Sequence, residues 1–253
     1  MSPRIFSRVI TGLNIVVIAF AITHGLLRTG NPSRYFGEGR YTTFLSAAQL
    51  LGIGLLSWRI FRLRVVNSSK KFSDTTESDT AGGRWIWLLM AAGFLFLAID
   101  EVAQLHERMD RGIIRFFNLP RTPLTDRIDD AILAAYGLAG LALMWCCRRE
   151  LLNFRRAMLG PMLAGFAAMF VGILCDTAAN DNHYLFRLTG DLAAAQALNG
   201  WFSALEGAFT LLPEAMFLTA FHAAWRQALP VLPMPMAEPA DGIPEEMEAG
   251  ERS

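Results

Sequence analysis

Six long apolar stretches constrain the fold of this chain more than any other feature of its sequence. They cover residues 9–27, 43–58, 85–105, 131–147, 157–175 and 201–225. A helix needs roughly 20 residues to cross a hydrocarbon core about 30 Å thick, and a chain within lipid must satisfy its backbone hydrogen bonds internally. The sequence therefore predicts an all-α bundle of six transmembrane helices over residues 1–229, followed by an acidic, Pro-rich tail over residues 230–253.

Composition agrees with a membrane protein and excludes two other classes. Hydrophobic residues make up 53% of the chain and charged residues only 18%, whereas about a quarter of a soluble domain is charged. The 23 basic and 23 acidic residues cancel, so no overall basic field would attract nucleic acid. The three cysteines, Cys146, Cys147 and Cys175, lie in or beside apolar runs and do not form the disulfide framework of a small secreted protein.

The distribution of basic residues predicts the orientation of the bundle. Lysines and arginines are more frequent in the segments on the side of the N-terminus than in the opposite loops, and cytoplasmic loops carry such an excess. We expect both termini in the cytoplasm, and short surface helices in the outer loops over residues 106–130 and 176–200. Residues 67–83 and the tail are polar enough to lack a fold, and the acidic tail offers a binding segment for a cytoplasmic protein.

Ionisable residues concentrate at the predicted outer ends of the helices. The densest run is Ile99-Asp100-Glu101-Val102-Ala103-Gln104-Leu105-His106-Glu107, at the end of the third apolar stretch. Other stretches bring carboxylates or imidazoles to the same level, namely His24, Asp129, Asp130, Asp176 and Glu206, with Asp181 and His183 just beyond Asp176. Ionisable groups within a membrane are costly and usually functional. We therefore place the candidate site at this outer end.

A metal-dependent hydrolase is the first hypothesis for this site. Carboxylate oxygens and imidazole nitrogens are ligands for zinc or iron, although the chain has no H-E-x-x-H motif. The candidate ligands of a divalent metal are Asp100, His106, Glu107, Asp176, His183 and His24. Glu101 or Glu206 would act as the general base on a metal-bound water. The substrate would be a lipid, a lipid-linked molecule or another small molecule that enters from the outer leaflet.

A transporter coupled to protons or metal ions is the second hypothesis, and it uses a polar line on the last apolar stretch. Glu206, Thr210 and Glu214 recur every four residues, and the line continues to His222. Pro213 leaves one backbone carbonyl unpaired and allows a kink. Glu214 and His222 are thus predicted to continue a proton pathway from the outer acids toward the inner side.

A membrane scaffold or assembly protein is the third hypothesis. In this case the acids only pair with outer arginines such as Arg108 and Arg111 and fix the helix packing. Asn14 and Gln49 are isolated polar residues in apolar stretches, and such groups usually form hydrogen bonds between helices. We expect that role for both, whichever hypothesis holds.

The run Phe96-Leu97-Ala98-Ile99-Asp100-Glu101, followed by Leu105-His106-Glu107, resembles a D-E…H-E run found near a helix end in a set of poorly characterised bacterial polytopic membrane proteins. This resemblance implies a multi-pass protein of a bacterial inner membrane and supplies no activity. The chain is also faintly similar to alkaline ceramidase-like membrane hydrolases, whose helical bundle holds zinc through histidines and an aspartate. Those hydrolases have seven helices and paired histidines on the last helix.

Overall fold

The computed structural model describes residues 1–37, 39–71, 84–120, 122, 128–180 and 182–229, and this part of the chain is helical without any strand. The described residues therefore confirm the all-α prediction. The helices are α1 (Pro3–Thr29), α2 (Tyr41–Lys71), α3 (Trp85–Ala103), α4 (Leu105–Phe116), α5 (Ile128–Cys146), α6 (Arg148–Leu152), α7 (Arg155–Asn180), α8 (Asn182–Thr189) and α9 (Leu192–Ala228).

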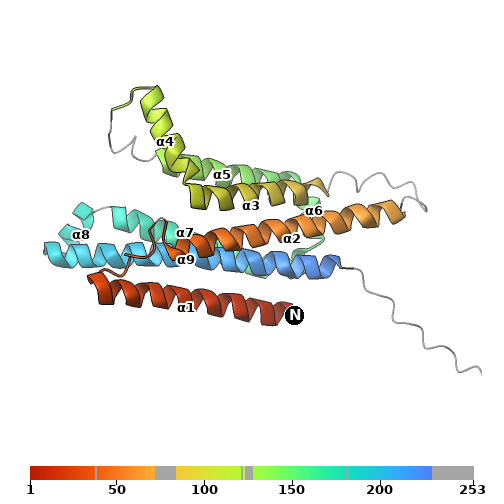
Figure 1. Ribbon diagram of the computed structural model, residues 1–253, viewed down its shortest axis with the longest axis horizontal. Coiled ribbons are helices and arrows are strands. Elements are labelled where there is room, and N and C mark those ends of the chain that lie inside the picture. The colour runs from red at the N-terminus through yellow and green to blue at the C-terminus, as the bar shows by residue number, and fades with distance from the viewer. Residues whose placement is uncertain (38, 72–83, 121, 123–127, 181, 230–253) are drawn as a thin grey trace, which may run out of the picture.

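Five helices are long and apolar enough to cross a membrane, namely α1, α2, α3, α7 and α9. The apolar stretch of α5, Ala134–Cys146, is shorter than these. Nevertheless α5 runs beside α3 between the same two ends of the bundle (Figure 1). The transmembrane bundle is confirmed, and the sixth crossing by α5 stays a prediction.

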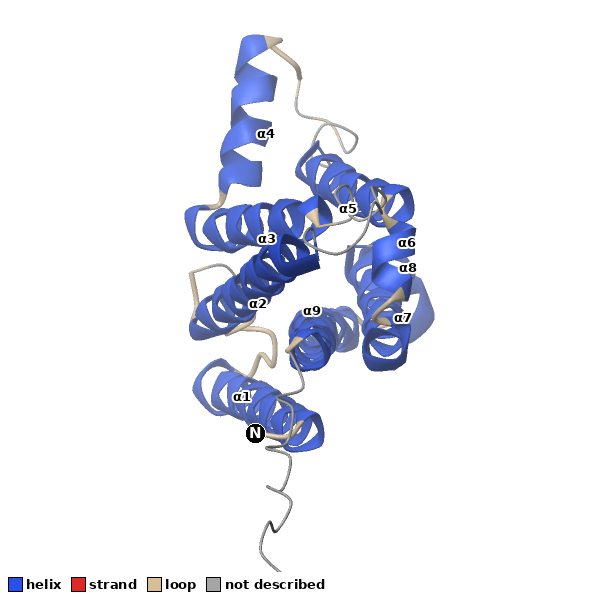
Figure 2. Ribbon diagram, turned by 90° about the vertical axis from the view of Figure 1, so that its right-hand side faces the viewer, coloured by secondary structure: helices blue, strands red, loops and turns tan. Residues whose placement is uncertain are grey.

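Helix α9 occupies the centre of the bundle. It packs against α7, α2, α1 and α8, while α2 also packs against α3. Viewed along the helices, α1, α2 and α7 surround α9, and α3 and α5 lie beyond α2 and α7 (Figure 2). At about 1.5 Å per residue, the 37 residues of α9 span about 55 Å. It is therefore longer than a hydrocarbon core of about 30 Å, and its first turns project at the end of the bundle that holds α8 (Figure 1).

An apolar core fills the half of the bundle near the two termini. Trp87 of α3 is fully buried, and its ring meets Phe154 and Phe221 edge-on at centroid distances of 5.0 and 6.1 Å. Ile53 and Ile60 of α2 complete this core and are also fully buried. The half of the bundle nearer the termini is therefore held together by dispersion and close packing.

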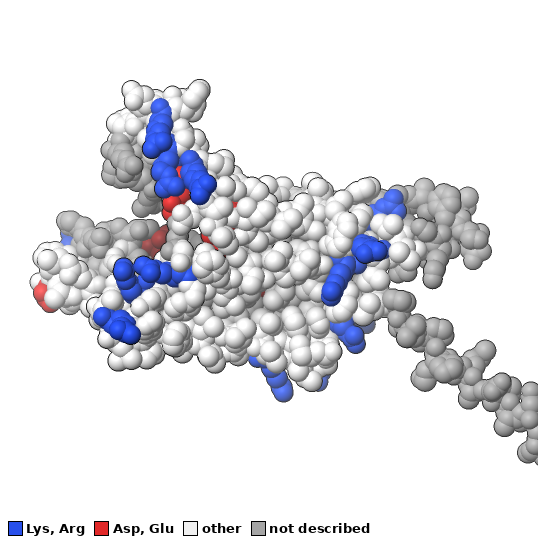
Figure 3. Space-filling model, in the orientation of Figure 1, with Lys and Arg blue, Asp and Glu red and all other residues white. Residues whose placement is uncertain are grey.

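The surface of the bundle matches a bilayer. Basic side chains gather toward its two ends, and the broad belt between them carries almost none on the face shown in Figure 3. Large apolar side chains such as Val16, Leu55 and Phe170 are exposed. An exposed apolar surface of this extent marks contact with lipid rather than with water.

The predicted outer loops do contain short helices, α4 and α8. Helix α8 packs against α9, whereas α4 leaves the bundle and has no buried residue (Figure 1). Helix α2 continues to Lys71, so the prediction that the inner loop begins at residue 67 is wrong. Residues 72–83 and the acidic tail over residues 230–253 lie outside the described part of the chain.

Candidate functional site

A sharp corner between α3 and α4 brings Asp100 and His106 together. Gln104 adopts the left-handed conformation, with φ of 54°, and its backbone N–H still bonds to the Asp100 carbonyl at 2.6 Å. The Asp100 side chain then accepts the backbone N–H of His106 at 2.8 Å, through Oδ1. Its other oxygen, Oδ2, lies 2.9 Å from His106 Nδ1. One carboxylate, only 3% exposed, thus fixes both the start of α4 and the His106 ring.

This corner corrects the expectation that the helix runs without interruption to Leu105. In an uninterrupted helix, His106 would project on a different side from Asp100. Because Gln104 reverses the backbone, α3 ends at Ala103 and the first turn of α4 folds back over Asp100. Left-handed residues are usually Gly or Asn, so the glutamine gave no sign of the break.

Ser46 of α2 joins two acids from two other helices. Its hydroxyl donates a hydrogen bond of 2.7 Å to Oε1 of Glu214 in α9. The carboxyl of Glu101 in α3 lies close to Ser46, and it interacts electrostatically with Asp100 and His106. Glu214 and Glu101 in turn interact with each other. We call these five residues, Asp100, His106, Glu101, Ser46 and Glu214, the acid cluster.

Burial distinguishes the acid cluster from a solvated helix end. Ser46 is 2% exposed and Glu214 9% exposed. The Oε2 atom of Glu214 has no hydrogen-bond partner among the described residues. A buried polar atom without a partner costs free energy, so this carboxyl is a group for which a functional explanation is needed.

Glu214 lies at a different depth from the one predicted. The sequence predicts that Glu214 continues a polar track into the inner half of the bundle, yet its carboxyl bonds to Ser46 and interacts electrostatically with Glu101, near the end of α3 that leads to α4. The reason is the length of α9, which begins at Leu192 rather than near residue 201. Its first turns project beyond the bundle, and Glu214 thereby comes level with Ser46 and Glu101.

His222 is separated from the acid cluster by apolar packing. Its ring stacks on Phe6 at a centroid distance of 4.0 Å and lies 5.7 Å from Trp225. Leu218 and Phe221, both buried, occupy the stretch of α9 between Glu214 and His222. The predicted polar track is therefore not continuous through the described residues.

His24 belongs to an aromatic group at the end of α1. Its ring stacks on Tyr35 at a centroid distance of 4.2 Å, and its Nε2 atom lies 3.4 Å from the Tyr35 hydroxyl. Phe20 and Tyr41 complete the group. The structure thus places His24 among aromatic rings, while Asp100 and His106 sit at the α3–α4 corner.

The remaining candidates lie in three further places. Glu107 forms an ion pair with Arg111 at 3.1 Å along α4, which is the pairing that the scaffold hypothesis expects. Glu206 of α9 interacts with Cys175, the residue before Asp176 in α7. The side chains of Asp129, Asp130 and His183, and residue Asp181, lie outside the described part.

A metal centre is therefore not assembled by the described residues alone. Within them, no group of three or more His, Cys, Asp or Glu side chains is arranged to hold a metal ion. Asp100 and His106 meet, but His24 stacks on Tyr35 and Glu107 pairs with Arg111. A divalent metal stays a proposal that requires ligands from the side chains outside this part.

Sequence reasoning missed Ser46 but predicted the neighbouring pair correctly. Gln49, one turn beyond Ser46, donates a hydrogen bond to Asn14 Oδ1 at 3.0 Å, and the Asn14 amide donates one to Gln49 Oε1 at 3.4 Å. This confirms the expected hydrogen bonds between helices. The signal for Ser46 was the polar spacing of Thr42, Ser46 and Gln49 along the buried face of α2.

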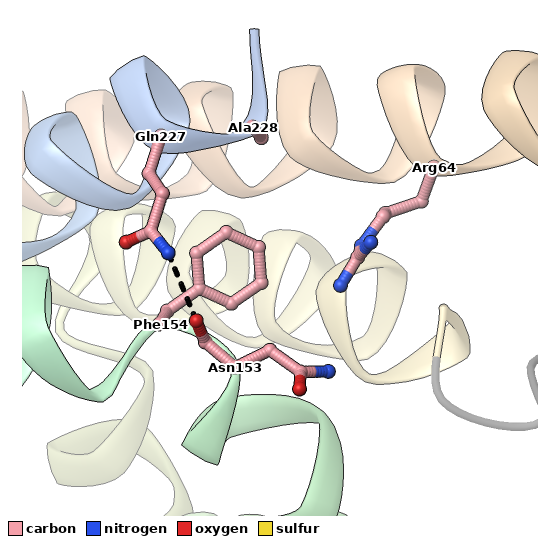
Figure 4. A pocket seen from close by; sticks show the side chains of 5 residues that line it. All are labelled: Arg64, Asn153, Phe154, Gln227 and Ala228. Atoms are coloured by element: carbon pink, nitrogen blue, oxygen red, sulfur yellow. Dashed lines mark hydrogen bonds between the residues drawn. The ribbon is translucent and has the colours of Figure 1, made fainter. Parts of the chain in front are cut away.

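A second polar group ties the helices at the end of the bundle near the termini. Glu150 accepts hydrogen bonds from Arg64 at 2.8 Å, Trp87 at 3.0 Å and Asn153 at 3.2 Å. A pocket of about 350 Å³ lies beside it, and Figure 4 shows Gln227 donating to the Asn153 carbonyl across this pocket. Its lining residues are Arg64, Asn153, Phe154, Gln227 and Ala228. The bonds around Glu150 are satisfied, and we interpret this group as a structural tie.

Comparison with known proteins identifies a family whose description names no activity. No curated protein and no solved structure matches the chain. A family model does match residues 9–231, which include most of α1 and all the later helices. Its description names no function, so it bears on neither the D-E…H-E resemblance nor the ceramidase-like one. The chain belongs to the family described as a domain of unknown function, DUF8692.

Proposed function

We propose that this protein is a proton-coupled transporter and that the acid cluster is its proton-binding unit. The supporting observation is the Ser46 hydroxyl, which donates a hydrogen bond of 2.7 Å to Glu214 and lies close to the carboxyl of Glu101. A hydroxyl can donate one hydrogen bond while it accepts another. A proton on one carboxyl can therefore pass to the other through Ser46.

The energetics of burial favour a shared proton at this position. An unpaired carboxylate inside a membrane bundle is costly, and two adjacent carboxylates also repel each other. A single proton shared by Glu101 and Glu214 removes one of the two negative charges. The pair is therefore more stable with one shared proton than with two negative charges.

The outer end of this route is the α3–α4 corner. Glu101 interacts with Asp100 and His106, and the His106 side chain is 13% exposed. Carboxyl and imidazole groups in a row are typical of membrane proton relays. With both termini in the cytoplasm, as the basic residues predict, this corner opens to the outer side.

The inner end is closed, so transport requires a change of conformation. Beyond Glu214 the core contains Leu218, Phe221 and Trp87, and no polar group of α9 bridges them to His222 within the described residues. Pro213 lies inside α9, directly before Glu214. Because proline lacks the N–H that would bond to Phe209, α9 can bend there. We propose that this bend exposes Glu214 to the inner side.

Proton flux into proteoliposomes tests the proposal. The purified chain is reconstituted with an internal pH-sensitive dye, and a potassium gradient with valinomycin drives protons inward. Wild type is expected to acidify the vesicles, whereas Glu214→Gln is expected to match protein-free vesicles. Asp191→Asn is the matched control, because Asp191 is an exposed helix cap at the outer end. Equal flux in wild type and Glu214→Gln would contradict the proposal.

A metal-dependent hydrolase of lipid or lipid-linked substrates is the second candidate. One observation favours it: the Asp100 carboxylate holds the His106 ring through one nitrogen, in the way that a carboxylate often holds the ring of a metal-binding histidine by the nitrogen that does not bind the metal. The purified protein would then contain about one zinc or iron per chain. His106→Ala would release this metal. A metal content near zero in wild type would exclude this candidate.

A further inference from the structure

Helix α4 runs across the direction of the membrane-spanning helices. It leaves the end of α3 and extends sideways from the bundle in both views (Figures 1 and 2). None of its residues is buried. A helix at the end of a transmembrane bundle that crosses the bundle axis runs along the membrane surface. The Asp100 clamp on His106 fixes this direction.

The apolar side chains of α4 are mostly exposed, although the Met109 sulfur accepts a hydrogen bond of 3.6 Å from the Tyr136 hydroxyl of α5. Met109 and Phe116 are seven residues apart, so they share one face of the helix, and they are 47% and 83% exposed. Phe117, which ends the helix, is 63% exposed. Such large exposed side chains on a short amphipathic helix need a partner that is apolar.

A neighbouring face of α4 carries the basic residues Arg108, Arg111 and Arg115. Basic side chains cover this helix in Figure 3, with acidic ones at its base. Arg111 pairs with Glu107. Arg108 and Arg115 have no ion-pair partner in the part of the chain that the structure describes. Their charges remain available for an anion beside the apolar face.

We propose that α4 lies in the outer interface of the bilayer and binds phospholipid. An apolar face with Phe and Met next to a basic face is the pattern of helices that lie in the membrane interface. Met109, Phe116 and Phe117 insert among the acyl chains, and Arg108 and Arg115 bind headgroup phosphates, for which guanidinium is well suited. Three observations support phospholipid as the partner. They are the orientation of α4, its apolar face, and the two arginines without an ion pair in the described structure.

Spin labels can test on which side of α4 the lipid lies. Phe116→Cys and Arg111→Cys are labelled with a nitroxide in a chain whose three native cysteines are replaced by serine. The protein is placed in vesicles of phosphatidylcholine and phosphatidylglycerol. The label at position 116 is expected to collide with oxygen dissolved in lipid, and the label at 111 with a water-soluble nickel chelate. Equal nickel access at both positions would overturn the proposal.

A second measurement keeps the native cysteines and identifies what covers the apolar face. Phe116→p-benzoylphenylalanine in the full chain is illuminated in the same vesicles, and the adduct is weighed by mass spectrometry. The proposal predicts an added mass of one phospholipid, and Arg108→Gln with Arg115→Gln should lower the yield of this adduct. An adduct with a second copy of the chain, or no lipid adduct at all, would overturn it.

Discussion

Asp100 acts at the scale of a single residue as the clamp of the α3–α4 corner. Its two oxygens bind the backbone N–H and the Nδ1 atom of His106 at 2.8 and 2.9 Å. A carboxylate at the first turn of a helix also interacts favourably with the helix dipole. The same residue therefore shapes the backbone and orients the imidazole beside Glu101.

Removing the charge of Asp100 should loosen this corner. Asp100→Asn is expected to lower the free energy of unfolding by about 1–3 kcal/mol, because buried hydrogen bonds to a charged group have that strength. Unfolding in mixed micelles, followed by circular dichroism, measures the change. Asp191→Asn is the matched control: it keeps a good cap at an exposed helix start and should change stability by less than about 0.5 kcal/mol. Equal losses in both variants would contradict the role of Asp100.

Asn14 and Gln49 should stabilise each other across α1 and α2. Both are buried and bond reciprocally through their side-chain amides. In a double-mutant cycle with Asn14→Ala and Gln49→Ala we expect a coupling of about 0.5–1.7 kcal/mol, the range of polar pairs in membrane bundles. Strictly additive losses would show that the two amides act independently.

At this scale the sequence predicted residue types better than residue partners. It predicted that Asn14 and Gln49 each form a hydrogen bond between helices, which is confirmed, and it named Asp100 and His106 as candidate site residues. It did not predict that His106 folds back onto Asp100, because this depends on the left-handed backbone of Gln104. It also missed Ser46, because the polar spacing of Thr42, Ser46 and Gln49 does not reveal which helix lies opposite.

At the scale of helices, small residues determine how closely α7 and α9 pack. A Cβ atom at Gly165 would lie 2.7 Å from the Phe217 ring, whereas one at Gly160 on the same helix would meet nothing within 4 Å. Gly165→Ala is therefore expected to destabilise the bundle by about 1–3 kcal/mol through overpacking.

Gly160→Ala supplies the matched control on the same helix. It should leave the stability unchanged or raise it by up to about 1 kcal/mol, because alanine favours a helix more than glycine does. Thermal unfolding in detergent compares the two variants. If both alanines had the same effect, the contact with Phe217 would not limit the packing of α7 on α9.

Hydropathy predicted which segments form long helices but not where they end. The stretch over residues 43–58 became Tyr41–Lys71, and the stretch over residues 201–225 became Leu192–Ala228. Hydropathy detects the part of a helix that contacts lipid, whereas a helix continues into its polar flanks as long as its backbone bonds hold.

At the scale of the whole molecule, the first and last described helices end on the same side. The start of α1 and the end of α9 lie toward one end of the bundle (Figure 1). This arrangement follows if α5 completes a sixth crossing. We expect epitope tags at the two termini to be reached from the same side of sealed vesicles. Access from opposite sides would show that α5 does not cross.

The bundle has the acid cluster toward one end, and the Trp87 core with the Glu150 group beside it toward the other. The acid cluster lies toward the end that holds α4, and the core of Trp87 and Phe221 closes the route toward the termini. Sequence reasoning found the gathering of acids at one end of the helices. It could not predict that Glu214 would join them, because that depends on the relative shift of whole helices.

Infrared difference spectroscopy of the reconstituted protein tests directly whether Glu101 and Glu214 share a proton. If Glu101 and Glu214 share a proton through Ser46, a carboxylic acid band should appear and disappear as the pH is cycled. This band should be lost in Glu214→Gln and kept in Asp191→Asn. A spectrum of Glu214→Gln identical to that of wild type would contradict a proton shared by Glu101 and Glu214.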